Sequence, residues 1–256
     1  MIPINGKPLI DYIVRYLAGF SEVSDLIIVC EFDHLGKQIV NYFEGKEEIV
    51  GKNIIFVEDK KMGTGGALLN VEMLVKQNDY FLVWFADNLC ALNMNDLVRQ
   101  YNSLTQREIE KHDDHKRFVG LIVTREYKFE ETGRVILDKV NNQQIKEFME
   151  KPMVKLESPE ALGIYLFTKN IFGFLHGRRL RRDKNKTSFN LSYDVLPHVL
   201  RTGSELFSYT LDNRTGWIDI ESPSYAERNK DIIDKIILQM SISHTYTNTN
   251  TDSTHK

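Results

Sequence analysis

The sequence has little cysteine and no long apolar run. Its 256 residues contain only Cys30 and Cys90, too few for a disulfide framework, so we expect two buried free thiols in a reducing, cytoplasmic setting. No run of about 18 apolar residues is present, which argues against a membrane span. The first residues, MIPINGKPLIDY, lack the apolar core of a secretory signal peptide.

An excess of charge of one sign is also missing. The formal net charge is −3 at pH 7, with 27% of residues charged. Such a chain has no global field that would attract nucleic acid or a membrane surface, so neither is expected as a partner. With 42% hydrophobic residues, the chain can bury the core of one large domain, or of one domain with a small appendage.

Helical patterns alternate with short apolar strands over the first 105 residues. The expected elements are helix 6–20, strand 25–30, helix 34–45, strand 53–57, helix 66–76, strand 80–85 and helix 93–104. Continuously apolar strands between helices are typical of an α/β fold whose sheet is mostly parallel, with helices on both faces. A helix opens the chain where such a fold expects a strand.

The second part of the chain changes character. Four strands are expected with few helices between them, at 118–124, 133–138, 145–151 and 162–168. They suggest a mixed or antiparallel extension of the sheet, followed by helices at 192–203 and 222–240. Residues 241–256 have little apolar content and are expected to be a disordered tail.

The segment MGTGGALLN (62–70) lies between an expected strand and a helix. Bare backbone at Gly63, Gly65 and Gly66 could approach a flat ring or a phosphate, and the start of the helix offers free N–H groups. A tight turn that only satisfies backbone geometry explains the glycines about as well. The pattern matches neither G-x-G-x-x-G nor the P-loop, which argues against those two kinds of site.

Two aspartates follow apolar strand-like runs. Asp87 comes after FLVWF, at the carboxyl end of an expected strand, where ligands bind in open α/β sheets. Asp219 lies in WIDIES, where strand alternation places it on the side of Trp217. Two such carboxylates could hold one Mg²⁺, because this ion prefers oxygen ligands. Capping of the helix that follows is the alternative for each.

Glu150 and Lys151 lie at a strand end, before Pro152. A lysine at the mouth of an acid-lined cleft is a natural partner for an anionic substrate group. A solvated surface lysine is the ordinary alternative.

The chain resembles the sugar-1-phosphate nucleotidyltransferases, which make NDP-sugars, in seven segments between residue 1 and about 235. In order, these are INGKPLIDYIVRYL, MGTGGAL, FADNL, GRVILD…FMEKP, LGIYLF, SYDVLP and WIDIESPSYAERNKDI. The resemblance implies a Rossmann-like α/β core with a sugar-binding extension. It also implies Mg²⁺-dependent joining of an NTP to a sugar 1-phosphate, with release of pyrophosphate. The domain would cover 1–240, with a nucleotide-binding half at 1–105 and a sugar-binding part at 106–240.

Carried over by position, the resemblance implies three sets of site residues. The nucleotide would lie against Gly63, Thr64, Gly65 and Gly66. Asp87 and Asp219 would hold Mg²⁺ and, with Lys151, form the catalytic set. Lys151 would neutralise the sugar phosphate, with Gly133 and Glu150 near the sugar.

The chain departs from the family pattern at its start. The family's glycine-rich loop and first strand lie upstream of PINGKP, so the resemblance implies an N-terminally incomplete domain. The loss of phosphate contacts would lower the rate by about 10³-fold or more. Ala86 stands where the family has glycine, and ALGIY lacks the usual asparagine.

Two other functions stay open, and so do the nucleotide and the sugar. One is a non-catalytic nucleotide-sugar-binding subunit, in a homo-oligomer or paired with a full-length paralogue. The other is a glycosyltransferase with a related core. A D-x-D pair would favour the glycosyltransferase, and ADNL offers a single aspartate.

Overall fold

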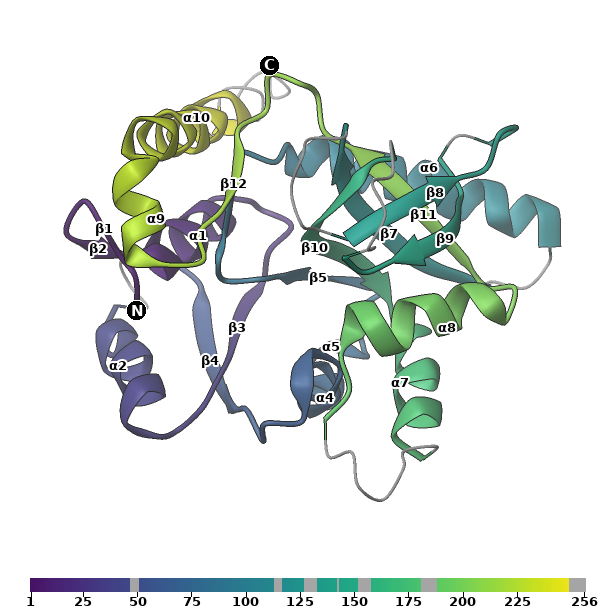
Figure 1. Cartoon of the computed structure of the whole chain (residues 1–256), viewed down its shortest axis with the longest axis horizontal. Coiled ribbons are helices and arrows are strands. Elements are labelled where there is room, and N and C mark those ends of the chain that lie inside the picture. Colours follow the sequence, from purple (N-terminus) through teal and green to yellow (C-terminus); the bar gives the residue numbers. More distant parts are fainter. Residues whose placement is uncertain are drawn as a thin grey trace, which may run out of the picture. The chain divides into compact units, whose positions relative to one another are not determined.

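The computed structural model describes residues 1–46, 51–112, 117–126, 133–141, 143–151, 158–180 and 188–248. The chain forms two compact units: unit 1 combines residues 1–58, 85–94 and 214–256, and unit 2 combines 59–84 and 95–213 (Figure 1). Each unit therefore joins stretches that are distant in the sequence. The units do not divide at residue 105, where the sequence placed the boundary between two halves.

Unit 1 contains three small pairs of strands and four helices among its described residues. Its elements are β1 (Pro3–Ile4), β2 (Lys7–Pro8), α1 (Leu9–Ala18), β3 (Asp25–Cys30), α2 (His34–Phe43), β4 (Asn53–Glu58), β6 (Asn88–Cys90), β12 (Trp217–Asp219), α9 (Pro223–Arg228) and α10 (Lys230–Asn248). Strands β3 and β4 pair in parallel, whereas β1–β2 and β6–β12 are antiparallel.

Helix α1 anchors the strand that carries the first candidate acid. Its buried residues recur at helical spacing, as in Leu9, Ile13 and Leu17, so one face packs into the core. From the same helix, the Tyr16 hydroxyl donates a buried hydrogen bond of 2.6 Å to the carbonyl of Leu92, just after β6. The core of unit 1 thereby supports the end of β6.

Helix α10 runs to Asn248, so residues 241–248 are helical and were wrongly expected to be disordered. The rest of the expected tail, 249–256, lies outside the described residues. No helix in the described part of the chain is long and apolar enough to cross a bilayer.

Unit 2 is organised around a six-stranded sheet. Its elements are α4 (Gly63–Asn70), α5 (Glu72–Val75), β5 (Tyr80–Trp84), β7 (Phe118–Arg125), β8 (Gly133–Leu137), β9 (Ile145–Met149), β10 (Glu160–Thr168), α7 (Ile171–Leu180), the π-helical turn η1 (Leu191–Val195), α8 (Leu196–Arg201) and β11 (Glu205–Thr210). Helix α6 (Met94–His112) also belongs to unit 2, except for its first residue, which is the last residue of the 85–94 stretch of unit 1. The strand order is β11-β7-β10-β8-β9, and β5 also pairs with β10. Every residue of β10 is buried, as expected for the strand that three others flank.

The α/β class is confirmed, but the strand directions differ from those expected. Among the described strands, the parallel pairs are β3–β4 and β7–β11, and the remaining pairings are antiparallel. The parallel pair β3–β4 is joined through helix α2, as parallel strands require a crossover. Strands β6 and β11 were not expected as sheet members; β6 is only three residues long, too short for a periodic pattern.

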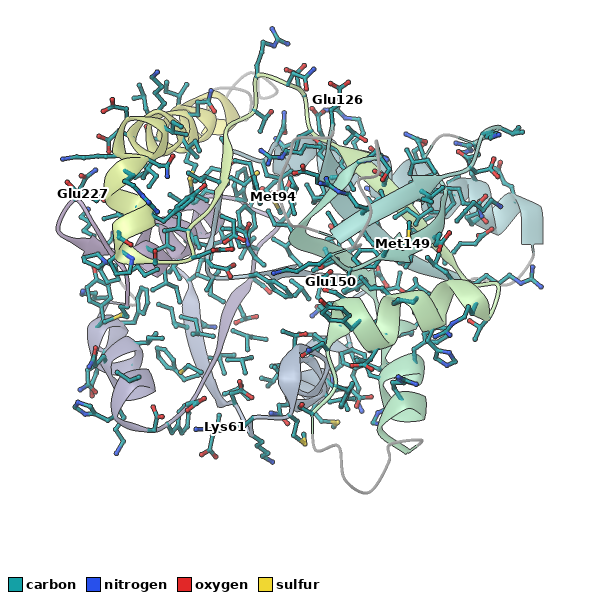
Figure 2. All side chains as sticks on the ribbon, in the orientation of Figure 1. Lys61, Met94, Glu126, Met149, Glu150 and Glu227 are labelled. Atoms are coloured by element: carbon teal, nitrogen blue, oxygen red, sulfur yellow. The ribbon has the colours of Figure 1, made fainter. Side chains whose placement is uncertain are left out.

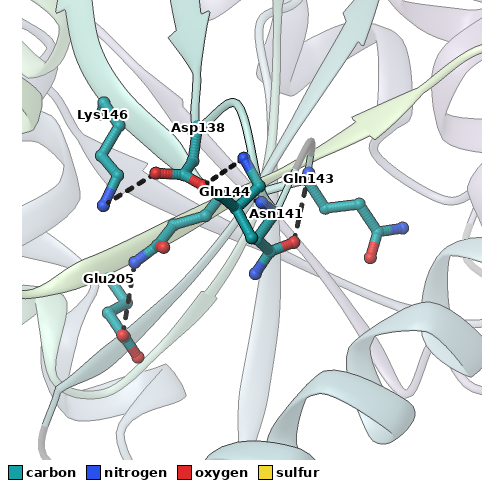
Figure 3. A network of polar contacts seen from close by, with 7 residues as sticks. Asp138, Asn141, Gln143, Gln144, Lys146 and Glu205 are labelled. Carbon is teal, nitrogen blue, oxygen red and sulfur yellow. Dashed lines mark hydrogen bonds and ion pairs between the residues drawn. The ribbon is translucent and has the colours of Figure 1, made fainter.

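A hairpin in unit 2 brings two candidate site residues opposite each other. Strands β8 and β9 pair antiparallel with Arg134 opposite Met149, so Gly133 and Glu150 lie next in register. The Asp138 carboxylate closes the turn by accepting hydrogen bonds from the N–H groups of Asn141 (2.7 Å) and Val140 (2.8 Å), with the Lys146 ammonium 3.3 Å away (Figure 3). These backbone hydrogen bonds lower the pKa of Asp138.

Three charged side chains are buried together where β7, β8 and β10 meet. The Glu160 carboxylate is fully buried, 2.9 Å from Arg125 Nε and 2.8 Å from Arg134 Nη1. Burying these charges is tolerable because each has a partner of opposite sign. Removal of the shared carboxylate would leave two buried guanidinium groups without this counter-charge.

We therefore expect Glu160→Ala to lower the free energy of unfolding by about 3–5 kcal/mol, as is typical of breaking a buried ion pair. Chemical denaturation of the variant measures this loss. Glu147→Ala, at an exposed position on β9, is the control and should change stability by about 0.5 kcal/mol or less. Equal losses in the two variants would contradict a structural role for the buried charges.

Candidate active site

The two candidate metal ligands come together in unit 1. A turn closed by a 3.1 Å hydrogen bond from Asn88 N to Phe85 O places Asp87 directly before β6. Strand β12 then pairs antiparallel with β6, so that Asp219 lies opposite Asn88. The N–H of Ile220 donates to the Asp87 carbonyl at 2.8 Å. The main chains at the two aspartates are therefore neighbours.

Apolar residues on both strands hold this pairing in register. Leu89 and Ile220 are completely buried, and Trp217 and Ile218 are nearly so. Neighbouring strand residues such as Trp217 and Ile218 face opposite sides of the pair, so both sides are packed, and a slip of one residue would exchange side chains between two packed faces. Burial of the apolar positions thus fixes where the acids lie.

Electrostatics around Asp87 disfavour its charged form. Although the residue as a whole is exposed, protein atoms around its carboxyl group remove hydration, and this desolvation raises its pKa. Hydrogen bonds from its own N–H and from Asn88 Nδ2 (2.7 Å) act in the opposite direction. The nearby Glu221 carboxylate raises the pKa further.

Sequence reasoning missed Glu221. The available signal was the strand-like spacing in WIDIES, since residues two apart on a strand share a face and Glu221 follows Asp219 by two positions. With Glu221, this part of unit 1 carries three acids.

The donor chemistry of this region suits magnesium. No group of three or more His, Cys, Asp or Glu side chains arranged to hold a metal occurs among the described residues. Mg²⁺ in nucleotide enzymes usually takes one or two carboxylates and completes its shell with water and phosphate oxygens. Two aspartates therefore fit an ion that is completed by a phosphate ligand.

The glycine segment lies in unit 2 and packs against its own chain. Gly63 begins α4 with a φ of +76°. A Cβ at Gly63 would lie 2.6 Å from the Phe189 carbonyl oxygen, and one at Gly65 would lie 2.6 Å from the Phe189 ring. At Gly66 it would overlap Met62 Cβ. Close approach within the protein thus accounts for all three glycines, without any ligand.

The N–H groups expected to be free at the start of α4 are also partly used. The N–H of Gly65 donates to the Phe189 carbonyl at 3.1 Å, and that of Thr64 donates to Asn190 Oδ1 at 3.4 Å. The Thr64 hydroxyl accepts a hydrogen bond from Leu191 N at 2.8 Å. Contact of the segment with a nucleotide stays a prediction.

The candidate sugar-binding residues meet at the end of the β8–β9 hairpin in unit 2. Glu150 directly follows β9 (Figure 2), and a Cβ on Gly133 would lie 2.9 Å from Glu150 Oε2. Burial raises the pKa of Glu150, while Lys151 and a hydrogen bond with Ser192 lower it. Lys151 is exposed, with a left-handed φ of +43°. Pro152 lies outside the described residues.

The candidate residues are thus divided between the units. Asp87 and Asp219 are adjacent in unit 1, whereas Gly63–Gly66, Gly133, Glu150 and Lys151 belong to unit 2. Ser192, which sequence reasoning did not single out, contacts Glu150.

Solved structures show which fold this architecture is. A UDP-glucose pyrophosphorylase solved with UDP-glucose superposes with a TM-score of 0.67 over 92% of this chain and 89% of its own, at 22% identity. HddC from Yersinia pseudotuberculosis, complexed with GMP-PN, superposes with a TM-score of 0.61 over 90% and 88%, at 18% identity. The chain has the Rossmann-like α/β fold of the sugar-1-phosphate nucleotidyltransferases.

The family follows from the sequence comparison. The family model described as Nucleotidyl transferase matches residues 1–235, and the chain belongs to that family. It is 26% identical over 248 residues to the bifunctional protein GlmU of Methanocaldococcus jannaschii, covering 92% of this chain and 49% of that protein. It is also 26% identical over 200 residues to the glucose-1-phosphate adenylyltransferase of Mycoplasma mobile, covering 72% and 50%.

A third relative is mannose-1-phosphate guanyltransferase beta-A of Xenopus laevis, 22% identical over 226 residues, with coverage of 85% and 56%. The chain spans about half the length of the curated relatives it matches.

The packing of the glycine segment predicts a selective effect of a single methyl group. Gly65→Ala should lower the free energy of unfolding by about 1–3 kcal/mol, because its Cβ would overlap the buried Phe189 ring. In the control Gly173→Ala, in α7, the Cβ meets nothing within 4 Å, and stability should rise by about 0.5–1 kcal/mol. Denaturant titration compares them, and equal stability would contradict the packing.

The raised pKa of Asp87 predicts that this residue costs stability when ionised. Asp87→Asn should raise the melting temperature at neutral pH, because the amide carries no charge to desolvate or to repel Glu221. The folded-state pKa lies above the unfolded one, so the gain should be full above the folded pKa and vanish as pH falls below the unfolded value. Melting curves across acidic to neutral pH test this, and a lower melting temperature at neutral pH would contradict it.

Proposed function

We propose that this protein is a Mg²⁺-dependent nucleotidyltransferase that joins an NTP to a sugar 1-phosphate and releases pyrophosphate. The observation that carries the proposal is the antiparallel β6–β12 pairing, which sets Asp87 beside the strand end bearing Asp219 in a chain of the nucleotidyl transferase family. The two carboxylates suit such a reaction because they could hold the Mg²⁺ that offsets the negative charge of the phosphates.

The proposed chemistry needs no enzyme nucleophile. A phosphate oxygen of the sugar 1-phosphate attacks the α-phosphorus of the NTP in line, the bond from that phosphorus to the bridging oxygen breaks, and pyrophosphate leaves. The protein's work is to position two polyanions and to offset their charge. Asp87 and Asp219 would hold Mg²⁺, which when bound neutralises charge on the phosphate oxygens.

Unit 2 supplies the remaining proposed roles. The Lys151 ammonium is exposed and would pair with the phosphate of the sugar. The half-buried carboxyl of Glu150, beside the bare backbone of Gly133, would bind sugar hydroxyl groups. The segment Gly63–Gly66 would lie against the base and ribose, an assignment supported by its place in the family motif.

The relatives' names suggest the substrates to test first. Mannose 1-phosphate with GTP, and glucose 1-phosphate with ATP, UTP or dTTP, are the pairs we propose for the first assays. We place the reaction in the cytoplasm, a setting supported by the two buried cysteines, which are thiols and not a disulfide.

Pyrophosphate release with each pair, in the presence of Mg²⁺, tests the proposal. Asp87→Asn and Asp219→Asn should each lower kcat/KM by about 10²-fold or more, because each removes charge that would hold the ion. Lys151→Met should mainly raise KM for the sugar 1-phosphate. Glu227→Gln, which changes an exposed acid on α9 (Figure 2), is the matched control and should behave like the unaltered protein.

Three outcomes would contradict this function. Full activity of Asp87→Asn would show that the Asp87 carboxylate is not needed to hold Mg²⁺ and would contradict the proposed mechanism. Nucleotide-sugar binding without pyrophosphate release for any pair would favour a non-catalytic binding subunit. Transfer of the sugar to an acceptor, with release of nucleoside diphosphate, would favour a glycosyltransferase.

A further inference from the structure

Residues 189–194 of unit 2, which we call the bridge segment, contact both proposed ligand-binding regions of that unit. The segment leads into and forms most of η1. On one side it meets the glycine segment, and on the other it meets Glu150. Gly66 and Glu150 are 84 positions apart in the sequence, and the bridge segment contacts both regions.

The contact with the glycine segment is made largely by main-chain hydrogen bonds. Phe189 N donates to the Met62 carbonyl at 2.9 Å, and Gly65 N donates back to the Phe189 carbonyl at 3.1 Å. Leu191 N donates to the Thr64 hydroxyl at 2.8 Å. The Phe189 side chain is buried over the bare backbone of Gly65. A change in the position of either segment must therefore shift or strain the other.

The bridge segment is also held in place from its far end. The Asp194 carboxylate accepts from Asn190 N at 2.7 Å and from Arg178 Nη2, on α7, at 2.9 Å. Between these points, η1 packs against β9, and Ser192 of η1 lies close enough to the Glu150 carboxyl to lower its pKa. Because a serine hydroxyl can donate to a carboxylate, Ser192 is placed to influence where the Glu150 carboxyl points.

We infer that Thr64 and Ser192 are positioning residues through which the bridge segment couples binding of the nucleotide to binding of the sugar 1-phosphate. The inference rests on the proposed function and deepens it. The Thr64 hydroxyl accepts a hydrogen bond from Leu191 N, and through this bond Thr64 acts on the bridge segment. A ligand that orders one region orders the other through the shared segment, and the second ligand then binds more tightly. The coupling must be reciprocal, since it is a free energy shared by two sites.

Isothermal titration measures this coupling without turnover. The probes are the α,β-methylene analogue of GTP with mannose 1-phosphate, and that of UTP with glucose 1-phosphate, in Mg²⁺. In the unaltered protein, the sugar 1-phosphate should tighten binding of the analogue by about 5-fold or more, a typical allosteric factor. Thr64→Val and Ser192→Ala should each reduce that factor towards one.

Two further variants separate coupling from general damage. Thr64→Ser keeps the hydroxyl and should restore the factor, whereas a merely structural loss of the threonine would not be rescued in this way. Thr202→Val is the matched control, because Thr202, like Thr64, is an exposed residue, and its hydroxyl makes a local hydrogen bond to the Val199 carbonyl at 2.6 Å. It should leave the factor unchanged. If Thr64→Val does not fold, Ser192→Ala carries the same comparison.

The outcomes separate this inference from the proposed function. Pyrophosphate release with no coupling between the probes, or coupling that Thr64→Val and Ser192→Ala leave intact, overturns the inference alone. Failure of the unaltered protein to bind either probe overturns the proposed function and the inference together.

Discussion

The antiparallel pairing of β6 with β12 is the interaction on which the candidate active site depends. Its hydrogen bond from Ile220 N to the Asp87 carbonyl joins two segments separated by most of the chain. Buried apolar residues on both strands set the register, so hydrophobic burial determines where the acids lie. The arrangement carries a cost, because desolvation and Glu221 oppose ionisation of Asp87. Perturbed pKa values of this kind are common at functional sites.

A different constraint shapes unit 2. The bare backbone of the glycine segment admits the bridge segment, and the same bridge segment reaches Glu150 through Ser192. The β8–β9 hairpin, closed by Asp138 and lying beside the buried charge of Glu160, places Gly133 opposite Glu150. Packing within unit 2 therefore orders the region that the family resemblance assigns to the ligands.

The sequence predicted the α/β class, most of the helices and the positions of the acids. Patterns such as FLVWFAD and WIDIES indicate an apolar strand that ends beside a carboxylate, and a few neighbouring residues are enough to recognise them. The strand directions were predicted poorly, because an apolar run reports burial and not the neighbour with which it pairs. Ser192 was missed for a related reason, since it matters only through Glu150, a residue that the fold brings near. Glu221 was missed although the spacing in WIDIES signalled it.

By itself, the sequence determined which charged residues are candidates for holding Mg²⁺ or pairing with a phosphate, and to which family the chain belongs. Tertiary structure alone decided that Asp87 and Asp219 become neighbours, that Gly63 and Gly65 face Phe189, and that the chain divides into two interleaved units. The physical reason is that local propensity acts over a few residues. Strand pairing and close packing join residues more than a hundred positions apart, and their energies depend on the whole core.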